Sequence, residues 1–478
     1  MTRPIRFLLG DAEVSEAAAP PTLTLLRYLR ERRGLVGTKE GCAEGDCGAC
    51  TVAIAEPRDG RLAYKAVNAC IHFLPAVDGK QVIPIESLGG DHPLQRAMVA
   101  HHGSQCGFCT PGFVMSLFAL YHRPGRHDDK AIKDMLAGNL CRCTGYRPIL
   151  DAARDALGEP RRDRFDEAET ATLARLETMR GEPPLDYAAA GGRYVAPRSA
   201  DQLATVLAAH PEARLVGGAT DVGLWVTKEM RELPLLVSTA EVEDMAYVRL
   251  AGDRLEIGAA ATYAGAVEAL SALHVDWRLL LRRLGSEQIR AVGTIGGNIA
   301  NGSPIGDTMP PLIALGASLM LRKGGTRRSL ALEDFYLGYR KTALAPGEFV
   351  EAIHLTLPPA HRRFAVHKLA KRFDQDISSV LGAFAFDVES GRVVRARLAF
   401  GGMAAVPKRA IAAETALTGQ PFERAAIEQA MEALGRDFQP LDDHRASAAY
   451  RLTAARNLLL KAWLELQGGD SIRIHGHG

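Results

Sequence analysis

The sequence lacks long apolar segments, a marked charge imbalance and any cysteine beyond residue 143. No stretch approaches the ~20 consecutive apolar residues of a membrane-spanning helix, so we expect no membrane domain. A net charge of +2 gives no reason to expect a nucleic acid or an anionic membrane as a partner. The short apolar stretch near the amino terminus is followed by acidic residues, unlike an export signal, so we expect a cytoplasmic protein.

All eight cysteines fall into two groups with metal-ligand spacing. The first group follows the pattern C-x4-C-x2-C-x19-C, which is the plant-type ferredoxin spacing for a [2Fe-2S] cluster. The second follows C-x2-C-x31-C-x-C, a four-thiolate set built from two close pairs. No cysteine is left over, which predicts an electron carrier with two iron–sulfur centres. The predicted ligands are Cys42, Cys47, Cys50 and Cys70 in the first group, and Cys106, Cys109, Cys141 and Cys143 in the second.

Disulfides and zinc are the alternatives for these cysteines. Four disulfides are typical of short secreted domains, whereas this chain has 478 residues and is 47% hydrophobic. Zinc suits paired cysteines, but the glycine-rich stretch 41–50 predicts a backbone that wraps closely and points N–H groups at anionic sulfides. Iron–sulfur is therefore favoured for the first group, and zinc stays open for the second group taken alone.

The second group lies among predicted helices. Thr110 is expected to cap a helix that has Pro111 at its start, and apolar residues continue with helical spacing over 113–120. Further helices are predicted over 129–137 and 149–157. Both cysteine pairs therefore precede helix starts, where the positive ends of helix dipoles favour an anionic cluster.

The first group lies in a module with more strand character. Strands are predicted over 5–9, 51–55 and 81–85, and Thr22 is expected to cap a helix that carries three leucines. This mixture is the outline of a small ferredoxin domain.

Two glycine-rich loops follow a charged stretch that has the composition of a solvated linker. The first loop, 214–222, runs from a short strand into paired glycines, and the second spans 293–307. Close backbone approach and side-chain donors suit a pyrophosphate, and Asp221 or Asp307 suits ribose hydroxyls. Neither loop has the dinucleotide fingerprint G-x-G-x-x-G. One such loop alone is better explained as a tight turn, but two loops downstream of two cluster motifs favour a nucleotide cofactor.

These motifs together resemble the molybdenum hydroxylases. The iron–sulfur half of these proteins has its counterpart in the stretches 41–50, 105–112 and 138–146 of this chain. Their FAD half has its counterpart in 215–222, 294–298 and 401–410. The chain has the iron–sulfur part before the FAD part and no molybdenum part, an order similar to that of the small subunits of bacterial xanthine dehydrogenases. In the family's carbon monoxide dehydrogenases the two halves are separate chains.

The resemblance implies an α+β multidomain fold that contains four domains and one linker. These are a plant-type ferredoxin-like β-grasp domain (1–86), a helical [2Fe-2S] domain (87–160), a linker (161–186), a two-part α+β FAD-binding domain (187–360) and an α/β carboxy-terminal flavoprotein domain (361–478).

The resemblance also implies roles for individual residues. The positions that match FAD contacts are Leu215, Val216, Gly217, Gly218, Ala219, Thr220, Asp221, Val222, Thr294, Gly297, Asn298, Asn301, Asp307, Val350 and Lys368. Tyr339 and Gln375 match the NAD site and the loop beside the isoalloxazine, and Gln105 matches a residue that faces the partner's molybdopterin. Eukaryotic members have an acid where this chain has Gln375, so flavin potential and the preference between NAD+ and oxygen stay open.

The expected function is electron transfer within a xanthine dehydrogenase. A large molybdopterin-binding partner would oxidise hypoxanthine to xanthine and xanthine to urate, and no catalytic residue for that hydroxylation is expected in this chain. Electrons would pass through two [2Fe-2S] clusters to FAD and then to NAD+, in an assembly of two small and two large chains. The alternatives are the same role for an aldehyde or another N-heterocycle, or a stand-alone iron–sulfur flavoprotein that acts as a diaphorase or redox sensor.

Overall fold

The computed structural model describes residues 2–158, 161–359 and 361–468. The chain forms two compact units, each built from several segments, and each is described by itself. The first comprises Met1–Ser199, Glu212–Val242 and Gly285–Gly293, and the second comprises Ala200–Pro211, Glu243–Leu284 and Thr294–Gly478. Residues of the predicted 187–360 domain fall in both units.

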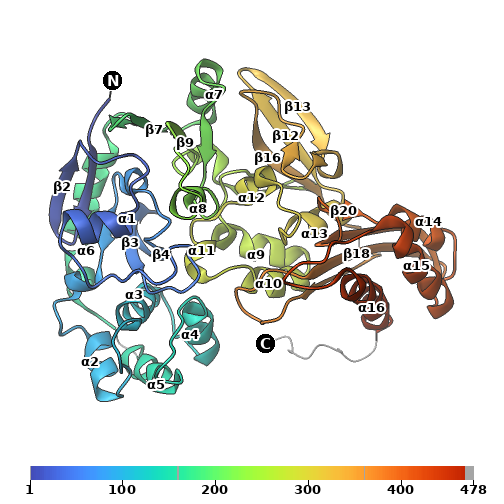
Figure 1. Ribbon diagram of the computed structural model, residues 1–478, viewed down its shortest axis with the longest axis horizontal. Helices are drawn as coiled ribbons and strands as arrows, with labels where there is room; N and C mark the ends of the chain where they lie inside the picture. Colours follow the sequence, from blue (N-terminus) through green and yellow to red (C-terminus); the bar gives the residue numbers. More distant parts are fainter. Residues whose placement is uncertain (1, 159–160, 360, 469–478) are drawn as a thin grey trace. The chain divides into compact units, whose positions relative to one another are not determined.

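The first unit begins with a five-stranded mixed sheet of order β2-β1-β5-β3-β4 (Figure 1). β1 runs parallel to β5, and the other neighbouring strands are antiparallel. Phe7 and Val52 of this sheet are fully buried in one core with Leu26 and Leu29, as expected for a half-buried sheet under a helical segment. The strands are β1 (Ile5–Leu9), β2 (Ala12–Glu16), β3 (Thr51–Arg58), β4 (Arg61–Asn68) and β5 (Gln81–Ile83). The helical pieces are α1 (Leu25–Arg27), the π-helix η1 (Tyr28–Arg32), and the 3-10 helices η2 (Leu74–Val77) and η3 (Ile85–Leu88).

The first helix begins after Thr24, so the prediction that Thr22 caps it is wrong. The Thr24 hydroxyl accepts a hydrogen bond from the Arg27 N–H at 3.4 Å. Both threonines precede the same leucines, and the cap falls on the one that directly precedes the fully buried Leu25.

Four helices build the second part of this unit. α3 is buried from Gly112 to Tyr121 and is therefore the central helix. Cys109 is its N-cap residue, so the prediction of Thr110 as the cap is wrong: Thr110 is the first helical residue, and its hydroxyl lies 2.7 Å from that of Ser104. The helices are α2 (Pro93–Ala100), α3 (Thr110–Tyr121), α4 (Asp129–Leu136) and α5 (Arg147–Ala156).

The segment 161–186, expected to be a solvated linker, contains the long helix α6 (Arg164–Arg180). Asp163 is the N-cap residue of this helix and forms a capping box with Asp166. The two side chains accept hydrogen bonds from N–H groups that have no partner within the first turn. Phe165 and Leu176 are buried, and the helix packs on β1, β3 and β4. The prediction of a solvated linker is therefore wrong for this helix, because a few apolar residues among many charges suffice to bury one face.

A smaller sheet of order β6-β7-β9-β8 completes the first unit. β8 and β7 both run parallel to β9, and β6 is antiparallel to β7. Its Tyr187, Tyr194 and Leu236 belong to the same core as the ferredoxin-like sheet. The elements are β6 (Leu185–Ala189), β7 (Gly192–Ala196), β8 (Arg214–Val216), β9 (Leu235–Ser238), α8 (Val222–Thr227) and α11 (Glu287–Arg290).

The second unit contains an antiparallel sheet of order β10-β11-β16-β12-β13, with helices around it (Figure 1). Ile257, Leu319 and Ile353 of its central strands are fully buried. The strands are β10 (Val248–Ala251), β11 (Arg254–Gly258), β12 (Ser318–Lys323), β13 (Thr326–Ala331) and β16 (Phe349–Thr356), with the separate hairpin β14 (Tyr336–Gly338) and β15 (Lys341–Thr342). The helices are α7 (Ala200–Ala209), α9 (Tyr263–Leu273), α10 (Val275–Arg282), α12 (Ile295–Asn301), α13 (Met309–Ala314), and the 3-10 helices η4 (Glu243–Met245) and η5 (Leu332–Asp334).

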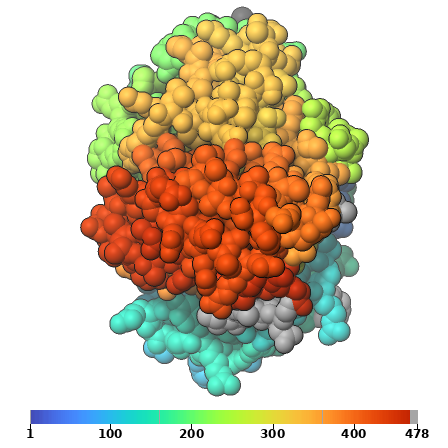
Figure 2. Space-filling model, turned by 90° about the vertical axis from the view of Figure 1, so that its right-hand side faces the viewer, coloured from blue at the N-terminus to red at the C-terminus, as the bar shows by residue number. Residues whose placement is uncertain are grey.

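The carboxy-terminal part of the second unit is an antiparallel sheet of order β17-β18-β19-β20 with three helices. Phe384, Phe400 and Leu434 are fully buried between the sheet and its helices. Figure 2 shows its orange and red residues as one continuous surface next to the yellow β12 and β13. The elements are β17 (Arg362–Leu369), β18 (Val380–Glu389), β19 (Arg392–Gly401), β20 (Lys408–Arg409), α14 (Ile411–Leu417), α15 (Arg424–Asp437) and α16 (Ala448–Leu466).

The multidomain α+β architecture agrees with the predicted fold class. Within the described ranges, every helix is too short or too polar to span a bilayer.

Candidate functional site

The first cysteine group lies on a loop that wraps around one sulfur. Backbone N–H groups point at the Cys42 Sγ from Glu44 (3.5 Å), Asp46 (3.3 Å) and Cys47 (3.4 Å). Hydrogen bonds from the thiols of Cys47 and Cys70 lower the pKa of Cys42 far below its usual value; burial opposes this shift, and the backbone donors add to it. The loop therefore has the convergent N–H groups that stabilise an anionic cluster.

The sulfurs of the second group meet in two pairs, Cys106 with Cys143 and Cys109 with Cys141. Burial, with a smaller effect of the Cys141 thiol, raises the pKa of Cys109 to about 12. The Thr144 hydroxyl lies 3.1 Å from the Cys141 Sγ, and the Thr144 N–H donates to it at 3.5 Å. Cys106 and Cys143 are exposed, so one side of this group lies at the surface of the chain.

The arrangement of the sulfurs separates the iron–sulfur and zinc interpretations. A tetrahedral zinc ion, with Zn–S bonds of about 2.3 Å, holds its four sulfurs about 3.8 Å from one another. Among the described residues, no three cysteine sulfurs lie within 4.8 Å of one another. The pairwise arrangement fits two metals with two thiolates each, so the second group favours iron–sulfur as well.

The two cysteine groups are in direct contact through their backbones. The Cys47 carbonyl accepts a hydrogen bond from the Leu140 N–H at 3.0 Å, and Leu140 directly precedes Cys141. Gly48 has a φ of +69°, and a Cβ there would lie 2.2 Å from the Gly138 carbonyl oxygen. Glycine is therefore required at position 48 both by its backbone conformation and by the close approach of the other loop.

The end of helix α8 is hydrogen-bonded to the first cysteine loop. Lys228, the C-cap residue of α8, donates from Nζ to the Cys42 carbonyl at 2.5 Å. The Thr227 hydroxyl donates to the Ala43 carbonyl at 2.8 Å. The first glycine-rich loop leads directly into α8, so this loop and the first cysteine group share one support.

The first glycine-rich loop, 215–222, connects β8 to α8. Ala219 has a φ of +58°, which turns the chain between the two elements. A Cβ on Gly218 would lie 2.0 Å from the Val292 carbonyl oxygen, so this glycine is needed for packing within the protein. The Asp221 Oδ2 is shielded from solvent and has no hydrogen-bond partner in the described part of the chain. This buried acceptor fits a ligand that brings a hydroxyl or amine donor, such as the adenosine part of FAD.

The second glycine-rich loop is organised by side-chain hydrogen bonds. The Thr294 hydroxyl caps α12 by accepting from the Gly297 N–H at 3.0 Å, and a Cβ on Gly297 would lie 2.6 Å from that hydroxyl oxygen. The Asn298 Oδ1 accepts from the Thr308 hydroxyl at 2.9 Å, which fixes the orientation of its amide. Asn301 is the last residue of α12. The loop therefore combines a fixed amide with a hydroxyl, the types of donor that suit a pyrophosphate.

Asp307 and Lys368, both predicted to contact FAD, form a buried ion pair. The Lys368 Nζ donates to the Asp307 Oδ2 at 2.6 Å, and the two side chains are 3% and 7% exposed. The Ser378 hydroxyl donates to the Asp307 Oδ1 at 2.5 Å. Ser378 was missed in the sequence because no local pattern joins it to an acid 71 residues away.

The remaining predicted residues occupy different environments in the second unit. Val350 is buried in β16. Tyr339 is 60% exposed between β14 and β15, so its ring is accessible to a ligand. Gln375 lies between β17 and β18 with a φ of +56°, an uncommon backbone conformation for a residue other than glycine.

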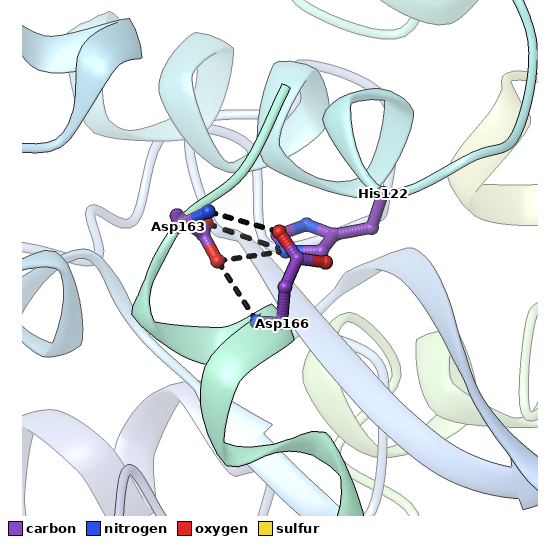
Figure 3. A group of neighbouring side chains, drawn as sticks. All are labelled: His122, Asp163 and Asp166. Carbon is purple, nitrogen blue, oxygen red and sulfur yellow. Dashed lines mark hydrogen bonds and ion pairs between the residues drawn. The ribbon is translucent and has the colours of Figure 1, made fainter. Parts of the chain in front are cut away.

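A separate group of metal-ligand residues lies where α6 begins. His122, Asp163 and Asp166 each place a ligand atom within 4.8 Å of the others (Figure 3). The His122 Nδ1 donates to the Phe118 carbonyl at 3.0 Å, and its Nε2 lies 3.3 Å from the Asp163 carboxylate. Both ring nitrogens of His122 are therefore already engaged in hydrogen bonds within the protein, which leaves neither free to bind a metal ion. His92 Nε2 also bonds to Asp163, at 2.8 Å, and the group is therefore a structural hydrogen-bond network around a buried carboxylate.

The Asp163 carboxylate remains ionised in this buried position. Burial by itself raises the pKa of Asp163, but the hydrogen bonds from His122 and His92 outweigh it and hold the pKa well below its usual range. This carboxylate therefore joins α2, α3 and α6 around the helical part of the first unit.

Four family models match successive parts of the chain. They are described as a 2Fe-2S iron-sulfur cluster binding domain (residues 9–74), a [2Fe-2S] binding domain (84–154), an FAD binding domain in molybdopterin dehydrogenase (188–358) and a CO dehydrogenase flavoprotein C-terminal domain (365–466). The chain therefore contains two [2Fe-2S] domains and an FAD-binding domain.

Individual relatives differ in their substrates. A xanthine dehydrogenase from Emericella nidulans is 33% identical over 91% of this chain, and the chain spans only 36% of that protein. Among solved structures, CO dehydrogenase from Oligotropha carboxidovorans has a TM-score of 0.54 and 28% identity, covering 57% of this chain and 97% of the matched one. Quinoline 2-oxidoreductase from Pseudomonas putida 86 has a TM-score of 0.53 and 25% identity, covering 58% of this chain and 97% of the matched one.

Replacing the buried carboxylate should destabilise the first unit. We expect Asp163→Asn to lower its free energy of unfolding by about 3 kcal/mol, because two buried histidines would lose the carboxylate to which they are hydrogen-bonded. Asp155→Asn is the matched control: Asp155 pairs with the partly exposed His101 at 3.1 Å, and its loss should cost below about 1 kcal/mol. Urea unfolding of both variants measures the difference.

The same experiment at two pH values tests the ionisation of Asp163. Its folded-state pKa is lowered, so its contribution is fully present above the unfolded value of about 3.9 and is lost only as the pH falls below it. The effect of Asp163→Asn should therefore be smaller at about pH 3, where the unfolded chain's carboxyl group is largely protonated, than at about pH 5. An effect no larger than that of Asp155→Asn would contradict a stabilising role of the buried Asp163 carboxylate.

Proposed function

Because the chain belongs to the molybdenum hydroxylase family and carries its iron–sulfur and FAD domains, we propose that it is the electron-transfer part of a xanthine dehydrogenase. It passes electrons from a molybdopterin-bearing partner through its two cysteine sites to FAD and on to NAD+. The partner oxidises hypoxanthine to xanthine and xanthine to urate. The observation that carries this proposal is the unbroken series of contacts, within the first unit, from the second cysteine group to the first and on to helix α8.

The cysteines hold the two clusters in this proposal. When bound, [2Fe-2S] clusters supply one-electron transfer, and FAD converts it to the two-electron hydride transfer that NAD+ requires. Thiolates of Cys42, Cys47, Cys50 and Cys70 bind one cluster, and those of Cys106, Cys109, Cys141 and Cys143 bind the other. The backbone donors around Cys42 and the Thr144 hydroxyl beside Cys141 stabilise the negative charge of each site.

The two glycine-rich loops bind FAD, each with its own kind of group. Asp221 supplies a buried acceptor that lacks a partner among the described residues, while Thr294 and Asn298 belong to a loop with fixed side-chain orientations. The ion pair of Asp307 and Lys368 anchors this second loop to β17. The full set of proposed FAD residues is 215–222, Thr294, Gly297, Asn298, Asn301, Asp307, Val350 and Lys368.

Tyr339 and Gln375 form the proposed NAD site. The exposed Tyr339 ring offers a surface on which a nicotinamide or adenine ring can stack. Gln375 lacks the charge of an acid, so the flavin potential and the preference between NAD+ and oxygen stay open in this proposal. The proposal also includes the partner chain, in an assembly of two small and two large chains. It places the protein in the reducing cytoplasm, since eight free thiols suit a reducing compartment.

The second candidate function is the same electron transfer in an enzyme with a different organic substrate. The similarity to quinoline 2-oxidoreductase favours an N-heterocycle other than a purine, and the organic substrate would in either case bind to the partner rather than to this chain. An aldehyde oxidase would use the same electron-transfer part.

The ligand assignment predicts separable cluster signals. The chain should carry about four irons and four acid-labile sulfides, two of each per cluster. Cys47→Ser should remove one low-temperature EPR signal and Cys109→Ser the other, because each variant removes one thiolate from one site. Loss of both signals from a folded single variant, or of neither, would show that the cysteines are grouped differently.

Substrate choice is tested on the complex of this chain with its molybdopterin-bearing partner. Added anaerobically, hypoxanthine should bleach the visible absorbance of the clusters within one turnover. Quinoline and benzaldehyde at equal concentration should bleach it more slowly. Faster bleaching by either of these compounds would contradict a xanthine dehydrogenase and favour the second candidate. The proposed electron-transfer role would be unaffected.

A further inference from the structure

A fully buried glutamine lies where the two cysteine groups meet. Gln288 is at the start of α11, far along the chain from all eight cysteines, and its exposed fraction is 0%. Its Nε2 lies within hydrogen-bond distance of three oxygens: Thr51 Oγ1 at 3.3 Å, Ser116 Oγ at 3.1 Å and Asn139 Oδ1 at 3.1 Å. One amide nitrogen therefore joins three segments that are distant in sequence.

These segments carry ligands of both proposed clusters. Thr51 directly follows Cys50 of the first group, and Asn139 lies two residues before Cys141 of the second. The Asn139 amide also donates to the Gly48 carbonyl at 3.1 Å, inside the first cysteine loop. Gln288 thus binds the point at which one cysteine loop already touches the other.

The hydrogen-bond network fixes which way the Gln288 amide points. The Ser116 hydroxyl donates to the Asn139 Oδ1 at 2.7 Å, so both oxygens are free to accept from Gln288 Nε2. The Gln288 Oε1 is buried without a hydrogen-bond partner among the described residues, and a Cβ on Gly138 would lie 2.1 Å from it. The side chain therefore fills the space beside Gly138 as well as donating to its neighbours.

We propose that Gln288 is a positioning residue that holds the two cysteine loops at a fixed separation, and so sets the rate of electron exchange between the two clusters. This inference rests on the proposed function. Between the loops, the backbone provides one hydrogen bond from Leu140 to Cys47 and the close contact of two glycines, Gly48 and Gly138. Loss of the Gln288 amide would leave buried acceptors on both loops with fewer donors, and the loops would move to regain them.

Gln288→Leu removes the amide and nearly keeps the side-chain volume. The full chain with its cofactors is reduced anaerobically with dithionite and studied by low-temperature EPR, in which two nearby reduced clusters split each other's signals. We expect both signals at full spin intensity with a reduced or broadened splitting. One-electron redistribution between the clusters, followed by rapid freeze-quench EPR, should be slower than in the wild-type protein.

Gln81→Leu is the matched control. Gln81 is also buried, 1% exposed, in the same ferredoxin-like sheet. Its Nε2 donates to the Gly10 carbonyl at 3.0 Å, and its Oε1 likewise has no partner among the described residues. Gln81→Leu removes a buried hydrogen bond, as Gln288→Leu does, but the Gln81 amide does not contact either cysteine loop. The splitting and the redistribution rate should therefore stay at their wild-type values.

The outcomes separate this inference from the function on which it rests. If wild-type protein shows no pair of [2Fe-2S] signals, the proposed function fails. If Gln288→Leu keeps both signals, the wild-type splitting and the wild-type rate, only the role of Gln288 is overturned. Should Gln288→Leu lose a cluster, Ser116→Ala removes a single acceptor from the same network; it should shift the splitting in the same direction by a smaller amount, and an unchanged splitting would overturn the role.

Discussion

The hydrogen bond from the Leu140 N–H to the Cys47 carbonyl, at 3.0 Å, is the contact on which the arrangement of this chain depends. It joins a β-rich module to a helical one at the residues that carry their cysteines. The contact is possible because Gly48 has no side chain, which lets its backbone lie close to the Gly138 carbonyl oxygen. Electron transfer falls steeply with distance, so a chain that carries two one-electron sites benefits most from rigidity at this point.

Within the first unit, the first cysteine loop is also held by hydrogen bonds from the end of helix α8. Lys228 and Thr227 donate hydrogen bonds to the backbone carbonyls of Cys42 and Ala43. They lie at the end of α8, which follows the glycine-rich loop that contains Asp221, whose Oδ2 has no hydrogen-bond partner among the described residues. These contacts, together with the Leu140–Cys47 hydrogen bond, restrict the movement of the first cysteine loop.

Much of the site was readable from the sequence because its chemistry is local. Cysteine spacing identified both groups, and β8 lies where a short strand was predicted before paired glycines, whereas the second predicted loop contains the helix α12. Features that depend on distant partners were not readable. α6 was predicted to be a linker because its composition is charged, yet Phe165 and Leu176 bury one face. Gln288 has no local pattern that links it to Thr51, which lies 237 residues away.

The flavin-dependent exit of electrons is the most direct test of the central claim. A [2Fe-2S] centre cannot accept hydride, so NADH needs the flavin as an intermediary. The measurement is anaerobic addition of NADH to intact and to FAD-depleted protein, with cluster reduction followed by visible absorbance and dithionite as the positive control. NADH should reduce the clusters of the intact protein and leave those of the depleted protein oxidised until FAD is restored. Rapid cluster reduction by NADH without FAD would contradict the claim that this chain links one-electron carriers to NAD+ through its flavin.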